Sequence, residues 1–553
     1  MMVEGKEAFH LALQSQAQNF IRGAFLITLA QLTSRLLGSI YRPVAQLFIG
    51  DQGLALVTPP ASAYYIVAAV SSVGLNVAIS RLISERLALG DGAGARRVYR
   101  VATGLLLASG LCFAALFALG AGWLAEAMGF PEAKPGFLVL APAVFLVSLV
   151  CTFRGLYQGM QRMQPSAVSQ VVEQFGRVGI GLVLVALLSP YALNYGAAGF
   201  NAGNTLGIFL AVIYGAWVIL RDRPMASWPQ AEVPGSWAHE SVLRLAGRIV
   251  AIALPLSVIG AILPLMQFVD SALVTNRLMA AGIAADAAKE ALAHLTNAAT
   301  LRDLPSILTT ALYVSLVPAI TESAATGQWE QASYRGSTAF RITLLVGVPA
   351  TMGLLVGARD AYGVLYTGSG WTLMAPLAWS TLFLMLQQTS SGILQGLGQI
   401  WITVRNLAAG VLVKIVLTYW WTGLPLLGAA GAAYATVAAF ATAAGLNLWA
   451  LHRCLRLRLN LWNDLGRPAV AAGLMGLVIW LTSPILRSAI PSPRLAGLVV
   501  IILGVLVYFM AILAVRGITA ADLGLIPGVR PWMIAFLRRY RLLRDEEEGG
   551  IQP

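Results

Sequence analysis

The hydrophobic positions of this chain form long, nearly continuous runs that short polar stretches interrupt. Most runs are about 20 residues or longer, the length that an α-helix needs to cross the hydrocarbon core of a bilayer. The pattern predicts about fourteen spans and therefore an all-α polytopic membrane protein. The predicted spans are 21–48, 57–86, 100–127, 136–159, 166–189, 197–220, 246–276, 305–326, 338–359, 373–396, 403–424, 428–452, 466–487 and 495–516.

The composition supports this class and excludes others. Of 553 residues, 58% are hydrophobic and only 11% are charged, whereas soluble domains carry about 25% charged residues. The three cysteines form no CxxC pair and the four histidines form no HxxxH or HExxH spacing, so no metal site is predicted. The chain also has no phosphate-binding P-loop and no G-x-S-x-G motif. We therefore expect no cofactor and no enzymatic activity.

Positive charge is distributed unevenly between the two sides of the predicted membrane. If the N-terminus is inside, the inner segments hold 25 Lys and Arg residues and the outer segments hold 7. Inner loops are enriched in Lys and Arg, so both termini are predicted to be cytoplasmic. The same bias explains most of the net charge of +13 without a nucleic-acid partner. The basic C-terminal tail is expected to lie against anionic lipid headgroups.

Three short segments recur in the same order along the chain. GLYQGMQ at 155–161 recurs as GILQGLG at 392–398, GAAG at 196–199 recurs at 428–431, and LNVAI at 75–79 resembles LVPAI at 316–320. The offsets are 237, 232 and 241 residues. Such an offset contains six helices, an even number, so the two halves keep one orientation in the membrane. We expect two parallel-repeat six-helix lobes around a central cavity, plus two C-terminal helices.

The predicted organisation follows from the spans, the repeat and the charge bias. It comprises a cytoplasmic N-terminus at 1–20, an N-lobe at 21–220, a cytoplasmic linker at 221–245, a C-lobe at 246–452, a two-helix appendage at 466–516 and a cytoplasmic tail at 517–553.

Several charged residues fall at membrane depth, where a charge is costly and usually faces a partner or a cavity. Arg35 and Arg42 are seven residues apart in the first span and therefore share almost one helix face. They either fix helix packing through partners or form a cationic stripe along a cavity, and we favour the stripe. Arg81 lies near the inner end of the second span, where snorkelling would also explain it. Arg302 precedes the eighth span, and a structural and a functional role are equally compatible with its position.

Four further residues are candidates for coupling or for structure. Glu173 and Arg177 are spaced i, i+4, which favours an intrahelical salt bridge. Asp270 lies near the outer end of the seventh span, and Lys414 lies deep in the eleventh. The set as a whole is richer in cations than in acids. It therefore favours an anionic substrate, because guanidinium groups suit phosphate and pyrophosphate, whereas an exporter of organic cations would need buried carboxylates.

Four segments carry a resemblance to a known family. These are FRGLYQGMQRMQPSAVSQVVEQ at 153–174 and the segments at 387–398, 76–86 and 269–278. They resemble the stage V sporulation protein B/YtgP branch of the MurJ-like lipid II flippase family. This family belongs to the multidrug/oligosaccharidyl-lipid/polysaccharide (MOP) exporter superfamily.

The resemblance implies fourteen helices, a groove for a lipid tail at the last two, and a location in the bacterial cell membrane. It implies transfer of undecaprenyl-pyrophosphate-linked peptidoglycan precursor, lipid II, to the outer leaflet. Arg35, Arg42, Arg81 and Arg302 fall at or near cavity arginines of the family. Arg42 lies one residue later than its counterpart, and Arg302 differs in its spacing to Pro305. The expected partners are a lipid-linked anionic substrate and the bilayer, with cell-wall synthesis enzymes as further candidates, and a monomer is expected.

Other functions stay open at this stage. A flippase for another polyprenyl-linked oligosaccharide would need the same cavity charge. A drug antiporter similar to the multidrug and toxic compound extrusion (MATE) transporters is disfavoured by the sign of that charge. Nothing in the sequence positively indicates a scaffold protein for wall or spore-coat assembly.

The charge bias generates a direct test of topology. A reporter that is active only outside the cytoplasm, fused after Pro553, is expected to be silent, because positively charged segments stay inside. An active fusion would contradict either the number of spans or their orientation.

Overall fold

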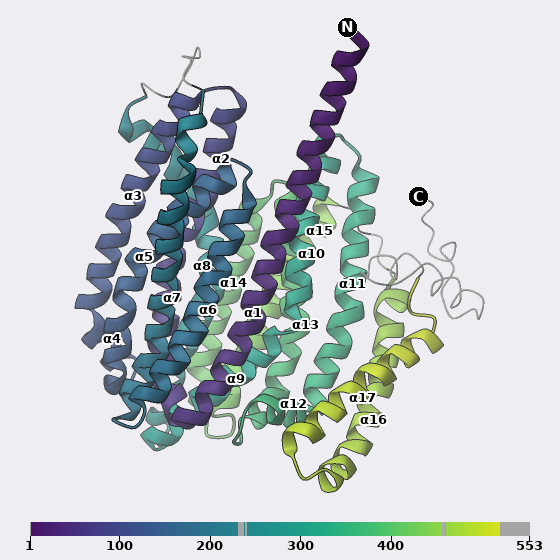
Figure 1. The fold of residues 1–553 in the computed structure, drawn as a ribbon. Coiled ribbons are helices and arrows are strands. Elements are labelled where there is room, and N and C mark those ends of the chain that lie inside the picture. Colours follow the sequence, from purple (N-terminus) through teal and green to yellow (C-terminus); the bar gives the residue numbers. More distant parts are fainter. Residues whose placement is uncertain (1, 230–236, 238–239, 456, 458–459, 520–553) are drawn as a thin grey trace. The chain divides into compact units, whose positions relative to one another are not determined.

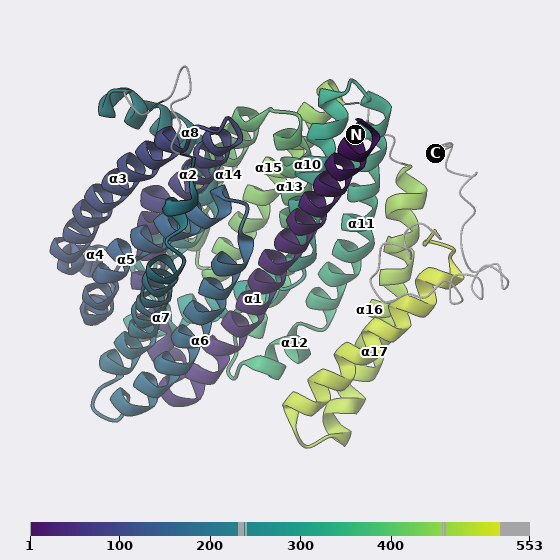
Figure 2. The same ribbon diagram turned by 45° about the horizontal axis from the view of Figure 1, so that its top comes forward.

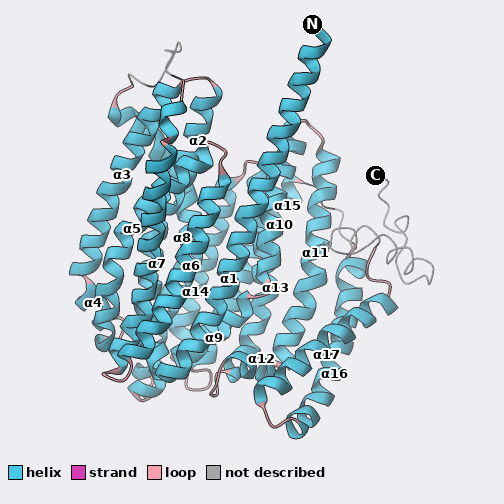
Figure 3. Ribbon diagram, in the orientation of Figure 1, coloured by secondary structure: helices cyan, strands magenta, loops and turns pink. Residues whose placement is uncertain are grey.

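The computed structural model describes the backbone of residues 2–229, 237, 240–455, 457 and 460–519. It describes the side chains of these residues except 2–32, 35, 36, 73, 227, 311, 314 and 315. Every regular element in these ranges is a helix (Figure 3). The all-α class predicted from the sequence is therefore confirmed.

The chain divides into two compact units, of which the first contains Met1–Asn276 and Ala284–Ala293. Within it, α5, α6 and α7 pack along one another (Figure 1), and α2, α3 and α5 enclose a common apolar core. Its helices are α1 (Met2–Ala68), α2 (Gly74–Ala88), α3 (Gly92–Leu119), α4 (Ala121–Ala127), α5 (Lys134–Gly159), α6 (Met163–Leu188), α7 (Leu193–Asp222), most of α8 (Val242–Ala280) and the first half of α9 (Ala285–Asp303).

The second unit contains Arg277–Ile283 and His294–Pro553. In it, α10, α11, α13 and α15 enclose a second core, and α16 and α17 form a hairpin (Figure 2). Its helices are the end of α9 (Ala285–Asp303), α10 (Ser306–Ala325), α11 (Trp329–Val356), α12 (Ala358–Leu365), α13 (Trp371–Gly396), α14 (Ile400–Thr422), α15 (Ala429–Cys454), α16 (Arg467–Ala489) and α17 (Pro493–Ala514).

The two compact units are not the same division as the two predicted lobes, whose boundaries follow the sequence repeat. The first turns of α8 contribute Leu245, Ile249 and Ala253 to the core around α2, α3 and α5. Contacts therefore group the start of α8 with the first unit, although the repeat assigns it to the second half. The predicted lobes at 21–220 and 246–452 stay a prediction.

Among the described residues, eleven helical segments are long and apolar enough to cross a membrane. Three differences separate this number from the predicted fourteen. The first two predicted spans count as one segment, Leu37–Ala88, and α10 and α13 are not counted. Both are nevertheless helices, of 20 and 26 residues, at the predicted places. In α13, the run Gln387–Ser391 lowers the hydropathy, and its side chains are mostly buried inside the protein.

The first two predicted spans are separate helices that meet at a kink. Gly50 has φ 61° and ψ −169° inside α1, a left-handed backbone that glycine tolerates and other residues rarely adopt. A second irregularity is the π-helix Ala69–Val73, which connects α1 to α2.

The internal repeat is visible in the structure as the same glycine-mediated helix contact in each of the two units. In the first unit, a Cβ placed on Gly159 of α5 would lie 2.9 Å from Ile83 Cβ and 3.0 Å from the Ser80 carbonyl oxygen. In the second unit, a Cβ on Gly396 of α13 would lie 2.7 Å from Ile320 Cβ and 3.0 Å from the Val317 carbonyl oxygen. All three positions are related by the offset of 237. Small residues allow such close helix contacts in membranes.

The third repeated segment needs a correction. The sequence comparison aligned Ile79 with Ile320 at an offset of 241, but the packing makes Ile83 the counterpart of Ile320. The error is four residues, about one helical turn. A shift of one turn keeps the same face of a helix toward its neighbour, so the hydrophobic pattern alone does not reveal it.

The linker is attached to the first unit through two tryptophans. Trp228 is buried and its Nε1 donates to the Met160 sulfur over 3.3 Å. The Trp237 ring lies between two arginines, with Arg86 Cζ 3.6 Å and Arg248 Cζ 4.1 Å from its centroid. Cation–π contacts of this kind stabilise a docked conformation.

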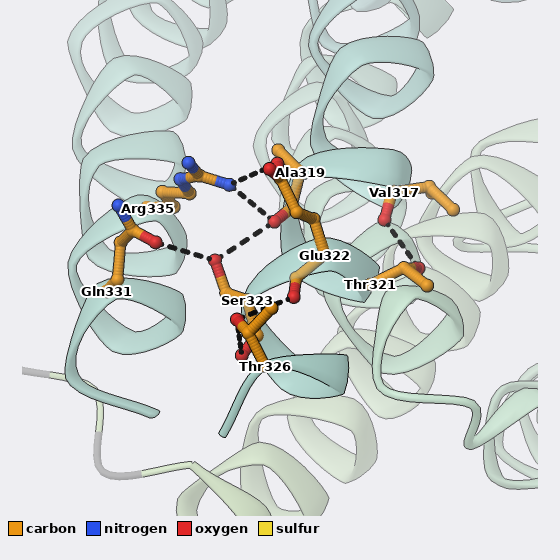
Figure 4. A network of polar contacts seen from close by, with 8 residues as sticks. All are labelled: Val317, Ala319, Thr321, Glu322, Ser323, Thr326, Gln331 and Arg335. Carbon is orange, nitrogen blue, oxygen red and sulfur yellow. Dashed lines mark hydrogen bonds and ion pairs between the residues drawn. The ribbon is translucent and has the colours of Figure 1, made fainter. Parts of the chain in front are cut away.

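Polar side chains link the end of α10 to the first turns of α11 in the second unit (Figure 4). Arg335 Nη1 donates to the Ala319 carbonyl over 2.6 Å and lies 3.5 Å from Glu322 Oε2. The Glu322 side chain is 73% exposed. This exposure leaves the ion pair weak.

The repeated glycine contacts predict a matched stability effect. Replacing Gly159 or Gly396 by Leu should destabilise the protein by roughly 1–3 kcal/mol, because overpacking forces the helices apart. Replacing Gly104 or Gly445 by Leu should be neutral or slightly stabilising, because no atom lies within 4 Å of a Cβ there and Leu favours helix over Gly. Thermal unfolding of the purified variants measures both effects. Equal losses in all four variants would contradict the packing motif.

Candidate functional site

The first predicted pair of arginines lies on α1. The side chain of Arg35 is outside the described residues, so the shared face of Arg35 and Arg42 stays a prediction. Arg42 is half-buried, and its Nη2 lies 2.9 Å from Thr58 Oγ1 and 3.5 Å from the Leu54 carbonyl oxygen. These oxygens follow the Gly50 kink, whereas Arg42 precedes it. Arg42 therefore joins the two arms of α1 through neutral acceptors.

Arg177 of α6 sits among aromatic side chains. Its Nη2 donates to the Tyr65 hydroxyl over 2.6 Å, and its Cζ lies about 6 Å from the ring centroids of Tyr41 and Tyr65. Tyr41 in turn stacks on Phe200 and donates to its carbonyl oxygen. The Nε of Arg177 is buried and has no hydrogen-bond partner in the described part of the chain. This guanidinium is thus held in place by tyrosines while one of its donors is left unused.

The predicted salt bridge between Glu173 and Arg177 is wrong. Glu173 Oε2 instead accepts from Arg154 Nη2 on α5 over 2.7 Å, and both side chains are less than one-fifth exposed. Ser169 accepts from Arg154 Nε over 2.9 Å and fixes the orientation of the guanidinium. The i, i+4 spacing permits the helical pair, but Arg154 offers a better oriented partner across the α5–α6 contact.

Arg81 and the acidic residue Asp270 are the remaining predicted site residues of the first unit. Arg81 is exposed on α2 and forms no hydrogen bond or ion pair with the residues that the structure describes. Asp270 is half-buried in α8. A pocket of about 290 Å³ in this unit is lined by α9 residues together with Gln52, Glu132 and Asn194, and none of the predicted arginines lines it.

Arg302 and Lys414 belong to the second unit. The Arg302 side chain is 7% exposed, lies 2.6 Å from Asp303 Oδ1 and donates to Ser380 Oγ over 3.3 Å. Its Cζ lies 5.3 Å from the Phe440 ring centroid. Lys414 is fully buried in α14 and donates to Thr436 Oγ1 on α15 over 2.9 Å. Both residues therefore contribute to helix packing in the structure.

Sequence reasoning did not identify a neutral network in the middle of the second unit. Asn406 Nδ2 donates to Asn447 Oδ1 over 2.9 Å, and Asn447 Nδ2 donates to Ser390 and Ser391 over about 3 Å. Gln387 extends the network to Ser391. The polar run in α13 was the available signal, although it does not identify the asparagine partners on α14 and α15.

The corrected pairing can be tested by double-mutant cycles on thermal stability. Substitutions of Arg154 and Glu173 should be non-additive, with a coupling of roughly 0.5–3 kcal/mol, because the two side chains form one buried contact. The same cycle between Glu173 and Arg177 should show a smaller coupling. A larger coupling between Glu173 and Arg177 would contradict the new pairing and support the predicted intrahelical salt bridge.

Comparison with known proteins gives both a family and relatives. The family model described as polysaccharide biosynthesis protein matches residues 20–324. Stage V sporulation protein B of Bacillus subtilis (strain 168) is 30% identical over 427 residues, 76% of this chain and 81% of that protein. Lipid II flippase MurJ of the same organism is 26% identical over 424 residues, 72% of this chain and 77% of that protein.

Solved structures agree on the fold. A lipid II flippase MurJ in an inward closed conformation matches with a TM-score of 0.65 and 15% identity, covering 88% of this chain and 98% of that chain. An inward-facing multidrug resistance MATE family transporter matches with a TM-score of 0.62 and 16% identity, covering 77% and 98%. At these identities the likeness concerns the fold alone. The chain is thus a multi-pass membrane protein of the polysaccharide biosynthesis protein family, with the fold of MOP superfamily transporters.

Proposed function

We propose that this protein is a flippase that moves undecaprenyl-pyrophosphate-linked peptidoglycan precursor, lipid II, from the inner to the outer leaflet. In this proposal, the charged headgroup crosses through the protein while the polyprenyl tail stays in the lipid. Alternating access between inward-open and outward-open states would carry the headgroup across.

The observation that supports an anionic headgroup is the state of Arg177. Its guanidinium is held by the Tyr65 hydroxyl, its Nε is buried without a partner among the described residues, and the nearby Glu173 is engaged by Arg154. A buried donor without an acceptor is costly. A phosphate or pyrophosphate oxygen would satisfy it and would match the guanidinium geometry.

The relatives support transport of a lipid-linked sugar but leave its identity open. One relative is named a lipid II flippase, whereas the more similar one is named only for sporulation. The family description refers to polysaccharide biosynthesis. The second candidate is therefore a flippase for another polyprenyl-linked oligosaccharide. A MATE-like drug antiporter has only the fold likeness in its favour, and a buried arginine with an unused donor disfavours a cationic substrate.

Transfer assays on arginine variants test the proposal. In proteoliposomes with fluorescent lipid II, Arg81→Ala and Arg177→Lys should each slow transfer about tenfold or more, since a charge-assisted contact contributes roughly 1.5–3 kcal/mol. Lysine keeps the charge of Arg177 but loses the planar fork. Arg35→Ala is expected to act in the same direction, and Arg35→Lys should restore only part of the rate.

Arg100→Ala is the matched control, because Arg100 is an exposed arginine at the start of α3. Its transfer rate should equal that of the unchanged protein. A parallel assay with an undecaprenyl-linked oligosaccharide that lacks the peptide separates the two candidate substrates. Transfer unaffected by Arg81→Ala and Arg177→Lys, in variants of normal thermal stability, would refute the arginine site.

A further inference from the structure

A second polar pocket lies in the second unit, where α12, the start of α13 and the turn between α16 and α17 meet. Its volume is about 680 Å³, within the range of small-molecule sites. Three arginines, Arg359, Arg487 and Arg494, line it together with a single carboxylate, Asp360. The lining therefore carries an excess of two positive charges.

The carboxylate is fully occupied by one of these arginines. Arg487 Nε and Nη2 donate to Asp360 Oδ1 and Oδ2 over 2.7 and 2.8 Å, and Ser483 Oγ donates to Oδ2 over 2.6 Å. Burial raises the pKa of Asp360, but the hydrogen bonds from Arg487 and Ser483 outweigh it and hold the pKa below its usual range. Asp360 is therefore ionised at neutral pH, and it neutralises Arg487.

The other two arginines are left without such a partner. Arg359 and Arg494 are exposed, and neither forms an ion pair with a carboxylate of the described residues. Arg359 Cζ lies 5.8 Å from the ring centroid of Trp371, which also lines the pocket. The one carboxylate of the pocket, Asp360, is already bound by Arg487, so Arg359 and Arg494 leave an excess of positive charge that attracts an anion with several acceptor oxygens.

The pocket has a rigid frame. A Cβ on Gly497 of α17 would lie 2.6 Å from the Asp360 carbonyl oxygen, so α17 rests directly on α12. The Tyr362 and Tyr366 rings contact each other at a tilt of 39°, with 5.3 Å between their centroids. The arginines are therefore positioned by packed helices and a fixed ion pair.

The surroundings indicate an amphiphile. Trp371 is exposed beside the pocket and is of a residue type that concentrates at the level of lipid headgroups. The hairpin beside the pocket exposes large apolar side chains along its length, namely Leu481, Ile485, Leu495, Leu498 and Ile502. An acyl or prenyl chain can lie on this surface while its phosphate enters the pocket. A free phosphate ion would leave most of the volume unfilled.

We propose that this pocket binds the phosphate group of an anionic membrane amphiphile, with Arg359 and Arg494 as its ligands and Arg487 and Asp360 as the frame. The amphiphile is either a phospholipid of the leaflet at this end or a prenyl diphosphate. The lining of this pocket includes none of the predicted cavity arginines, so its variants test the pocket separately from the transfer assay.

The test uses the purified full-length protein and measures thermal stabilisation by dioctanoyl phosphatidylglycerol, dioctanoyl phosphatidylcholine, farnesyl diphosphate and inorganic pyrophosphate. Phosphatidylglycerol should stabilise the protein more than phosphatidylcholine. In the double variant Arg359→Gln/Arg494→Gln, its apparent affinity should fall about tenfold or more, as expected from the loss of charge-assisted contacts. Arg494→Lys alone should lose only part of the affinity.

The control is Arg405→Gln/Arg453→Gln, which removes the same charge from exposed positions on α14 and α15 outside the pocket. Its affinity should be unchanged. Arginine-dependent binding of farnesyl diphosphate above that of phosphatidylglycerol would support the site and identify prenyl diphosphate as the source. The proposal is overturned if pyrophosphate binds as tightly as the amphiphiles, if neither amphiphile depends on Arg359 and Arg494, or if the control loses as much affinity.

Discussion

The structure depends on one constraint, which is that a polar group inside a bilayer must find its partner within the protein. The buried cations meet it in different ways. Arg154 uses the carboxylate of Glu173 on the neighbouring helix, Lys414 uses a hydroxyl on α15, and Arg177 uses a tyrosine on α1. Each contact joins two helices, so the groups that are costly to bury also determine which helices lie side by side.

Between these contacts, the helices approach through glycine. Gly159 and Gly396 allow the same close packing in the two units, and this equivalence explains why the repeat was visible in the sequence. The offset of 237 was readable because glycines at a close contact resist substitution by larger residues. The offset of 241 for the segment at 75–79 was wrong by one helical turn. A shift of one turn leaves the same side of the helix toward its neighbour, and the hydrophobic pattern shows only which side that is. The helical fold was thus predictable, whereas the register of one helix against its neighbour required the structure.

The candidate site was predictable in its chemistry and not in its pairings. The sequence predicted an ion pair for Glu173, and the structure gives it one, although the partner is Arg154 and not Arg177. The partner of Glu173 lies 19 residues away on α5, and that of Asp360 lies 127 residues away on α16. The spacing of residues within one helix can be read from a single sequence, whereas contacts between distant segments cannot. Local pairs are therefore predicted too often, and pairs between helices are missed.

Arg154 also explains why Arg177 keeps its charge available. Glu173 is one turn from Arg177 and could neutralise it through a change of side-chain rotamer, since i, i+4 neighbours lie on one face. Arg154 prevents this by binding the Glu173 carboxylate. Ser169 accepts a hydrogen bond from the Arg154 guanidinium and so fixes its orientation between α5 and α6. The tyrosines around Arg177 orient it without cancelling its charge. A cation held in this way can satisfy its unused donor with an anion that enters and leaves, which a permanent salt bridge would not allow.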